Sequence, residues 1–350
     1  MKIWYLPLEA YQERYTETLH IYTARQMRDQ GVDLAIVEAA SGTTQIRDGR
    51  VLDASRRVIT ATEQVSVLAQ AWDGIRDDDW IWIDDMFHPG ISGIAYLIEL
   101  TGKRPKVVVR NFAQSMDRFD FTATFGDWIR DYELMVDKIA DLVVCASDEH
   151  SDLMRVCGMR TRIENTGLPY CKDTTLKIAQ PSQEKVNAVA YSSRWDEEKQ
   201  PEIFLDMIQH LPDGWVGHVF TGSAELRGTD MYAIERAKSD SRIVIHANCT
   251  KEQYLTRLSA CRVHFNCALQ DWVSYTLLDA STMGVPSVVP AFRSFLEFMP
   301  ASQTYRPWDA SHAAEVVMKT AAYVYPNTQI WSEYHSRTVE RTIRIMESMK

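Results

Sequence analysis

The segment 261–290, CRVHFNCALQDWVSYTLLDASTMGVPSVVP, decides the fold. It opens with an apolar strand pattern, passes through a polar loop, continues as a helical pattern, and returns to β-branched residues after Gly284-Val285-Pro286. Short, nearly continuous apolar strands that alternate with helices are typical of a parallel sheet covered on both faces. The segment therefore predicts a strand–helix–strand unit of an open α/β sheet.

The same alternation extends outward over the whole chain. Strand patterns lie at 2–6, 34–37, 80–83, 107–110, 142–145 and 162–164, and again at 186–191, 216–221, 243–246, 263–266 and 287–289. Between them the stretch 170–184 is polar and has no periodic apolar face, which indicates a linker. We therefore predict two open α/β domains, at 1–170 and 185–325, followed by a helix at 326–350.

Composition sets limits on the function. The chain has 350 residues, of which 45% are hydrophobic and 25% charged, with a net charge of −10. These values exclude a mainly disordered, collagenous or coiled-coil architecture. The negative charge disfavours passive binding to nucleic acid. Six scattered cysteines are typical of a reduced cytoplasmic protein.

Several motifs of other protein classes are absent from the sequence. No uncharged apolar run is long enough to cross a bilayer, and the opening MKIWYLPLEA lacks the pattern of a signal peptide. Neither G-x-G-x-x-G nor G-x-x-x-x-G-K-[ST] occurs, which disfavours a dinucleotide oxidoreductase or a P-loop NTPase. We expect no membrane contact and no obligate protein partner.

Ligands of open α/β domains bind at the carboxyl ends of the strands, here in a cleft between two domains. We expect Asp271 in the loop after the strand and Asp279 on the helix that follows. The two lie eight positions apart, a spacing that in helical geometry is about 80° around the axis and about 12 Å along it. That separation suits the two ends of an extended ligand. Ser274, Tyr275 and Thr276 occupy the helix start, where free N–H groups bind phosphate. Solvated surface acids are the alternative interpretation of the two aspartates.

A second segment, AYSSRWDEEKQPEIFL at 190–205, follows the first strand of the same domain. Arg194 and Lys199 there place two cations beside a helix start, as the departure of a diphosphate from a sugar requires. A charged helix start without function is the alternative.

These residues resemble the retaining GT-B glycosyltransferases with an E-x7-E motif, the family 4-like group. The family pattern appears as Ser193-Arg194, Lys199, Asp271-x7-Asp279 and Gly284-Val285-Pro286. The segments IADLVVCASDEHSDLM and IENTGLP also look like the end of the family's first domain. The resemblance implies two Rossmann-like parallel-sheet domains facing across a cleft, with a C-terminal helix that crosses back to the first domain.

The resemblance also assigns roles in binding a nucleotide sugar, expected to be UDP-linked and used without a metal or other cofactor. Arg194 and Lys199 would contact the diphosphate, Asp271 the sugar hydroxyls and Asp279 the ribose. The remaining donor-binding residues implied are Gly222, Ser223, His246, Asn248, Ser274, Tyr275 and Thr276. Both acidic positions hold Asp where the family has Glu, and Pro7-Leu8-Glu9-Ala10-Tyr11 replaces the usual glycine-rich loop.

The first domain should bind the acceptor. In DDDWIWIDDMFHPG (77–90) a strand leads directly into Asp84, Asp85 and His88, which are candidates for acid/base work or for binding the acceptor hydroxyl. The alternative is that Asp85 or His88 caps the helix near Pro89. The D-x-D run at 77–79 precedes the strand, at the wrong end for the cleft, so we expect no metal site.

Another candidate loop is NFAQSMDRFDFT (111–122), which also follows a strand. The expected acceptor-binding residues there are Arg110, Asn111, Gln114, Ser115 and Asp117. Phe119 and Phe121 are candidate stacking surfaces, and a surface loop pinned by its phenylalanines is the alternative.

The opening MKIWYLPLEAYQERYT, with WIDDMFHPGI and RNFAQSMDRFDF, is similar to glycosyltransferases of tailed phages. Some of those enzymes glycosylate hydroxymethylated pyrimidines in phage DNA, which would place this chain in the host cytoplasm with double-stranded DNA as partner. The charge of residues 1–165, 19 basic against 27 acidic side chains, opposes a DNA acceptor. A carbohydrate or small-molecule acceptor, a sugar-nucleotide epimerase and an inactive nucleotide-sugar-binding protein remain alternatives.

Overall fold

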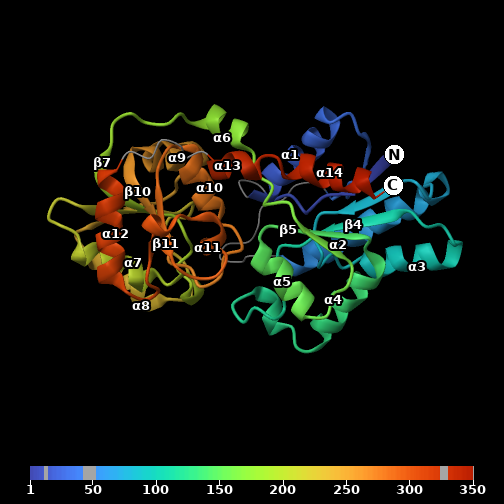
Figure 1. The fold of residues 1–350 in the computed structure, drawn as a ribbon, viewed down its shortest axis with the longest axis horizontal. Helices are drawn as coiled ribbons and strands as arrows, with labels where there is room; N and C mark the ends of the chain where they lie inside the picture. Colours follow the sequence, from blue (N-terminus) through green and yellow to red (C-terminus); the bar gives the residue numbers. More distant parts are fainter. Residues whose placement is uncertain (12–14, 42–52, 324–329, 350) are drawn as a thin grey trace. The chain divides into compact units, whose positions relative to one another are not determined.

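The computed structural model describes residues 1–11, 15–41, 53–323 and 330–349. The chain divides into two compact units (Figure 1). Unit 1 comprises Met1–Cys171 with Arg337–Lys350, and unit 2 comprises Lys172–Ser336. Among the described residues, no helix is both long and apolar enough to span a membrane.

Unit 1 contains one sheet of six strands in the order β2-β1-β3-β4-β5-β6, and every neighbouring pair is parallel. The strands are β1 (Lys2–Leu6), β2 (Asp33–Ile36), β3 (Trp80–Ile83), β4 (Lys106–Arg110), β5 (Leu142–Cys145) and β6 (Arg162–Asn165). The helices are α1 (Tyr15–Asp29), α2 (Ala54–Gln70), α3 (Ile91–Thr101), α4 (Trp128–Ile139), α5 (Asp148–Val156) and α14 (Thr338–Ser348).

Alternate residues of these strands supply two cores, one on each face of the sheet. Trp80 and Trp82 of β3 pack with α1 and α14, whereas Ile81 and Ile83 pack with α2, α3, α4 and α5. All four side chains are buried, which is why the strand is apolar throughout rather than alternating.

Unit 2 repeats this architecture with the strand order β12-β11-β10-β7-β8-β9, again parallel throughout. The strands are β7 (Val186–Tyr191), β8 (Val216–Phe220), β9 (Ile243–His246), β10 (Cys261–Phe265), β11 (Ser287–Pro290) and β12 (Thr304–Tyr305). The helices are α6 (Lys172–Ile178), α7 (Pro201–His210), α8 (Met231–Ser239), α9 (Lys251–Ala260), α10 (Tyr275–Thr282), α11 (Phe295–Phe298), α12 (Ala310–Ala322) and α13 (Ile330–His335).

Helices again cover both faces of the sheet in unit 2. The side chains of α7, α8 and α12 share one core with the strands, and those of α6, α9 and α10 share the other (Figure 1). The prediction of two open parallel α/β sheets is confirmed, because each segment with an expected strand pattern forms a strand. The two-residue strand β12 is too short to leave a sequence pattern.

Two segments differ in detail from the sequence-based expectation. The stretch 170–184, expected to be a linker without a periodic apolar face, contains the boundary between the units and also α6, whose Leu176 and Ile178 pack into a core of unit 2. The segment 330–350 was expected to form one helix, but it forms two. Helix α13 belongs to unit 2 and α14 to unit 1, so the break between the two helices lies at the boundary of the units.

Candidate functional site

Lys199 and Asp271 lie together at the carboxyl edge of the unit 2 sheet. The Lys199 ammonium donates to the carbonyl of Gln270 and lies 3.3 Å from Oδ1 of Asp271. Asn266 Nδ2 donates to Oδ2 of the same carboxylate at 3.4 Å, and Ser294 Oγ donates to the Asp271 carbonyl at 2.6 Å. Residues that follow β7, β10 and β11 therefore fix this aspartate in one position.

Arg194 lies on the loop after β7 and keeps its side chain half exposed. It pairs with Asp196 and, at 2.6 Å, with Glu198. Asp196 in turn accepts a hydrogen bond from the Thr229 N–H at 2.9 Å, which links this loop to the one after β8. The guanidinium is half exposed, so it can turn toward a diphosphate, although its partners Asp196 and Glu198 are only 14% and 16% exposed.

Asp271 lies in the loop after β10 and Asp279 on helix α10, as the sequence predicted. Helix α10 begins only at Tyr275, so the separation estimated from helical geometry does not apply to the two carboxylates. Asp279 is buried and pairs with Lys251, the first residue of α9. A ribose that bound Asp279 would have to share this carboxylate with Lys251.

The start of α10 retains the character of an anion site. Ser274 is the N-cap residue, but its side chain does not cap the helix and instead lies 2.9 Å from the hydroxyl of Thr276. The positive end of the helix dipole and the first-turn N–H groups are what a phosphate requires. Tyr275 and Thr276 are both partly exposed at this position.

The loops after β8 and β9 lie against each other. The Asn248 N–H donates to the Ser223 carbonyl at 2.9 Å, and the Cys249 N–H donates to the Thr221 carbonyl at 3.0 Å. Asn248 adopts a left-handed backbone with φ of 51°, a conformation that asparagine tolerates better than most residues. The predicted residues Gly222, Ser223, His246 and Asn248 are therefore neighbours.

Asp84 and Arg110 of unit 1 form a buried ion pair. Both are about 1% exposed. Asp84 also accepts hydrogen bonds from Tyr5 Oη at 2.7 Å and from Trp82 Nε1 at 3.2 Å. Burial, reinforced by the Asp84 charge, raises the pKa of Tyr5 well above its usual value. This arrangement is that of a structural pair inside the core.

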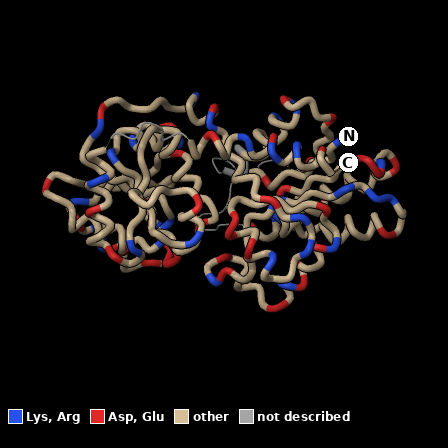
Figure 2. Tube along the Cα trace, viewed as in Figure 1, with Lys and Arg blue, Asp and Glu red and all other residues tan. Residues whose placement is uncertain are grey.

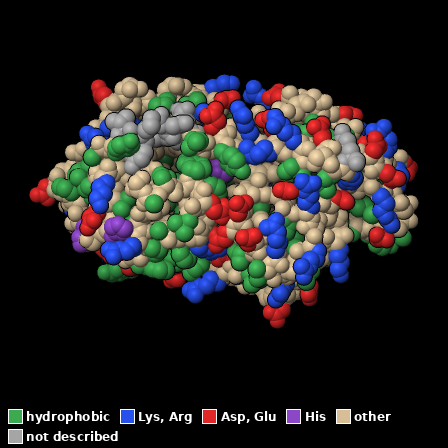
Figure 3. Space-filling view, in the orientation of Figure 1, with side chains coloured by type: hydrophobic (Ala, Val, Ile, Leu, Met, Phe, Trp, Pro, Cys, Tyr) green, Lys and Arg blue, Asp and Glu red, His purple; other side chains and the backbone are tan. Residues whose placement is uncertain are grey.

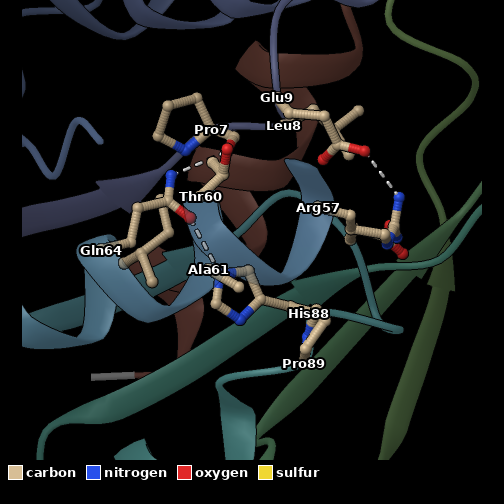
Figure 4. A pocket seen from close by; sticks show the side chains of 11 residues that line it. Pro7, Leu8, Glu9, Arg57, Thr60, Ala61, Gln64, His88 and Pro89 are labelled. Carbon is tan, nitrogen blue, oxygen red and sulfur yellow. Dashed lines mark hydrogen bonds and ion pairs between the residues drawn. The ribbon is translucent and has the colours of Figure 1, made fainter. Parts of the chain in front are cut away.

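Asp85 and His88 lie in a pocket of unit 1 (Figure 4). Asp85 pairs with Arg57 of α2, and its other oxygen accepts the Phe87 N–H at 2.9 Å. Arg57 also binds Glu9 at 3.0 Å.

His88 is held by two hydrogen bonds. Its Nδ1 accepts from the Gly90 N–H at 3.1 Å, so the proton resides on Nε2, which donates to Oε1 of Gln64 at 2.9 Å. The alternative interpretation, that His88 satisfies the start of the following helix, matches this geometry. Burial, reinforced by the charge of Arg57, lowers the pKa of His88 to about 4.

This shift predicts a loss of stability in acid. Between about pH 6.5 and pH 4 the unfolded chain binds a proton at His88 that the folded chain does not, so the free energy of unfolding falls as the pH falls. From pH 7 to pH 5 the loss is roughly 2 kcal/mol. His88→Asn keeps an acceptor for Gly90 but does not titrate. Urea unfolding should show a pH dependence smaller by about that amount, and an unchanged dependence would contradict the assignment.

The predicted acceptor residues of the 111–122 loop mostly hold the loop itself. Gln114 is buried, and its Oε1 accepts the Met116 N–H at 3.1 Å. Ser115 donates its hydroxyl to Glu133 at 2.6 Å, and Asn111 and Asp117 accept from N–H groups two residues ahead. These side chains fix the loop, whose outer surface is formed by other residues.

That outer surface is aromatic. Phe87, Phe121, Phe125, Trp128 and Tyr132 form a continuous series of ring contacts, with centroids 5.6–6.3 Å apart, which we call the aromatic patch. Trp128 is 57% exposed, Phe125 40% and Phe121 36%. Phe121 was predicted as a stacking surface, whereas Phe119 instead lies under the guanidinium of Arg118.

Other charged features of unit 1 have structural roles. Asp79 of the D-x-D run accepts hydrogen bonds from Lys2, Trp4 and Arg76 at the amino end of β3. Lys103 donates to three backbone carbonyls near Trp72. In the described part of the chain, no group of His, Cys, Asp or Glu is arranged to hold a metal ion.

Comparison with known proteins gives matches only among solved structures. No protein family and no curated protein matches the sequence. Anabaena Alr3699/HepE in complex with UDP and glucose is 13% identical, with 100% of both chains covered and a TM-score of 0.68. The lipopolysaccharide outer core galactosyltransferase WaaB is 12% identical, also with 100% of both chains covered, at 0.67.

Sucrose-phosphate synthase from Thermosynechococcus elongatus is 12% identical and matches over 100% of this chain and 97% of that one, with a TM-score of 0.66. The chain has the GT-B fold. At these identities the likeness is one of architecture. Within this GT-B chain, the residues that carry chemistry are identified by their own contacts.

Sequence reasoning missed Lys251, Arg57, Glu9 and Gln64. Lys251 had a usable signal, because the capping box of Thr250 and Gln253 places it at the start of a helix after a strand. Arg57 and Gln64 lie on α2, and their partners are distant in the sequence, so no local pattern marks them.

Proposed function

We propose that this chain is a glycosyltransferase that moves a sugar from a UDP-sugar to an acceptor hydroxyl. The observation that carries the proposal is the pairing of Lys199 with Asp271 at the carboxyl edge of the unit 2 sheet. Structures with the same fold include HepE with UDP and glucose bound. The uncapped start of α10 and the exposed Arg194 supply further groups suited to a diphosphate.

In this proposal Arg194 and Lys199 neutralise the charge that develops on the departing diphosphate. Asp271 orients the donor sugar through its hydroxyls. The acceptor hydroxyl attacks on the face that the nucleotide leaves, so the anomeric configuration is retained. NMR assignment of the product anomer tests this stereochemistry, and an inverted product would refute it.

For the acceptor we propose a 5-hydroxymethylpyrimidine of phage DNA, modified in the host cytoplasm. Support comes from the aromatic patch, because enzymes that act on an extruded base need stacking surfaces more than a positive surface. Figure 2 shows Lys and Arg interspersed with Asp and Glu along the chain, and Figure 3 shows the same mixture on one face. DNA contact would therefore be local and brief.

A carbohydrate acceptor is the second candidate. The mixed charge distribution favours it, and Lys103 is engaged with backbone carbonyls, so its ammonium is not directed toward a DNA phosphate. Trp128 is 57% exposed and suits a sugar ring as well as a base, since its indole combines an aromatic face with an N–H.

The two candidates predict different outcomes in one assay, the release of UDP from a panel of UDP-sugars. Release that requires DNA containing 5-hydroxymethylcytosine or 5-hydroxymethyluracil, and not unmodified DNA, would establish donor and acceptor together. Release that needs a glycan would support the second candidate. Interconversion of UDP-sugars without UDP release would indicate an epimerase. Binding of UDP without any turnover would indicate an inactive binding protein.

A further inference from the structure

The loops after β7 and β8 are held together by hydrogen bonds. The Asp230 N–H donates to the Trp195 carbonyl at 3.0 Å. The Thr229 N–H donates to Oδ1 of Asp196 at 2.9 Å. The segment 226–230, which we call the clamp, therefore lies against the loop after β7, although the bonded residues are more than thirty positions apart in the sequence.

Gly228 allows the two backbones to approach each other. A methyl group added at Gly228 would overlap the carbonyl oxygen and carbon of Trp195 and would lie 2.8 Å from its Cα, closer than Cβ atoms approach non-bonded neighbours. The overlap is with main-chain atoms, which cannot turn aside as the end of a flexible side chain can. Glycine is therefore required here for close approach of the backbone. Any other residue at this position would push the clamp and the neighbouring loop apart.

Side chains anchor both segments in the core of unit 2. Trp195 is 2% exposed and Leu226 of the clamp 5%, and the two belong to the same hydrophobic core. The Trp195 indole also packs edge-on against Tyr191 of β7, with ring centroids 5.6 Å apart. Because close-packed cores hold their side chains in fixed rotamers, Trp195 is a fixed point of the loop. Arg194 is the residue directly before it.

Asp196 connects the clamp to the Arg194 side chain. Its Oδ1 accepts the Thr229 N–H, while its Oδ2 pairs with the Arg194 guanidinium. The Asp196 side chain is only 14% exposed, so the carboxylate is held in place and directs the guanidinium that it contacts. The Lys199 ammonium is held independently, by the Asp271 carboxylate at 3.3 Å. The clamp therefore orients one of the two cations proposed for the diphosphate and not the other.

We infer that the clamp is a positioning element for the donor diphosphate and acts through Arg194. The positioning residues are Gly228 and Thr229 of the clamp and Asp196 of the facing loop. A guanidinium has five N–H donors, so Arg194 can keep its contact with Asp196 and turn its remaining donors toward a diphosphate. An arginine that is already oriented loses less conformational entropy on binding, which raises affinity. The inference rests on the proposed function, because it concerns the cation that would contact UDP.

The test is Gly228→Ala in the full-length chain, with binding of UDP and of uridine measured by calorimetry and by saturation-transfer NMR. We expect UDP to bind about tenfold more weakly, because a well-oriented contact between arginine and phosphate is lost. Uridine has no phosphate, so its affinity should stay the same. Gly217→Ala on β8 is the matched control and should keep the UDP affinity. The atoms nearest its added methyl are the ends of flexible side chains, Phe204 at 2.7 Å and Ile243 at 2.8 Å.

A double-mutant cycle shows whether the clamp acts through Arg194. On the Arg194→Ala background, Gly228→Ala should cause no further loss of UDP affinity, because the side chain that the clamp orients is already gone. Thr229→Val covers the case in which Gly228→Ala does not fold. Thr229 is exposed, and valine removes the hydroxyl that accepts the Glu197 N–H at 3.3 Å. We expect a loss of UDP affinity of about threefold, which also disappears on the Arg194→Ala background.

The outcomes distinguish this inference from the proposed function. A wild-type chain that does not bind UDP would refute the proposed function and this inference with it. If wild type binds UDP but folded Gly228→Ala binds it equally well, or loses uridine affinity to the same extent, the inference is overturned and the donor proposal stands. Independent losses of UDP affinity from Gly228→Ala and Arg194→Ala would also overturn it, since the clamp would then not act through Arg194.

Discussion

Lys199→Met is expected to lower UDP release from the best UDP-sugar by a factor of about 100–1,000, the usual cost of removing one preorganised group that stabilises charge in a transition state. The lysine is buried and touches both the carbonyl of Gln270 and the carboxylate of Asp271. Methionine keeps most of the volume but removes the charge. The variant therefore loses neutralisation of the diphosphate and also the contact that holds Asp271.

Two measurements distinguish these contributions. Calorimetric titration with UDP reports the diphosphate contact, and turnover with saturating UDP-sugar reports the transition state. Lys238→Met is the matched control, because Lys238 pairs with Glu235 on the surface of α8 in the same unit. Thermal unfolding shows whether the variant remains folded. A folded Lys199→Met protein with wild-type turnover would refute the donor-site assignment.

Arg194→Ala is also expected to lower UDP release, because the variant should bind UDP more weakly. The side chain is half exposed, whereas the side chains of its partners Asp196 and Glu198 are 14% and 16% exposed. Its removal leaves these two carboxylates without their cation, so thermal unfolding of the variant is measured beside UDP binding. The ratio of UDP affinities between wild type and variant tests the contact directly, and equal affinities would exclude Arg194 from the donor site.

The sheets could be predicted from the sequence because their strands are buried on both faces. A run such as Trp80–Ile83 is apolar at every position, as expected of a strand buried on both faces, and its short length and the flanking polar residues distinguish it from a helix. The pattern says less about where a helix begins. The sequence placed Asp271 in a loop and Asp279 on a helix, but the distance between them was estimated from helical geometry. The first helical residue is Tyr275, and loop contacts such as that of Ser294 Oγ with the Asp271 carbonyl fix the conformation before it.

The site in unit 1 was harder to predict, because its interactions join distant parts of the chain. Tyr5 and Asp84 are 79 residues apart, and Gln64 binds the carbonyl of Pro7 across 57 residues. The sequence identified Asp84 and Asp85 as equivalent candidates at the end of one strand. Alternation of side chains sends them in different directions, so Asp84 meets Arg110 in the core while Asp85 meets Arg57 at the pocket.

Asp84→Leu and Arg110→Met are each expected to lower the free energy of unfolding by about 3–5 kcal/mol, because each leaves one buried charge without its partner. The double variant should lose much less than the sum of the two, since it leaves neither charge uncompensated. Urea unfolding of the four proteins gives the coupling energy. The exposed pair Arg155 and Asp152 is the control, and the double-mutant cycle for this pair should give a coupling energy of at most about 1 kcal/mol.

Asp84→Asn separates a structural role from a catalytic one. The amide retains an oxygen that can accept from Tyr5 Oη, so part of the network survives while the charge that compensates Arg110 is lost. If Asp84 only stabilises the core, the turnover of the Asp84→Asn variant should be proportional to the fraction of folded protein. Turnover should then return to the wild-type value under conditions that stabilise the folded chain. A variant that stays folded but loses turnover by a factor of 100 or more would instead place Asp84 in the chemistry. Its burial beneath Tyr5 and Trp82 argues for the first result, because an acceptor cannot reach a carboxylate whose oxygens are both engaged inside the core.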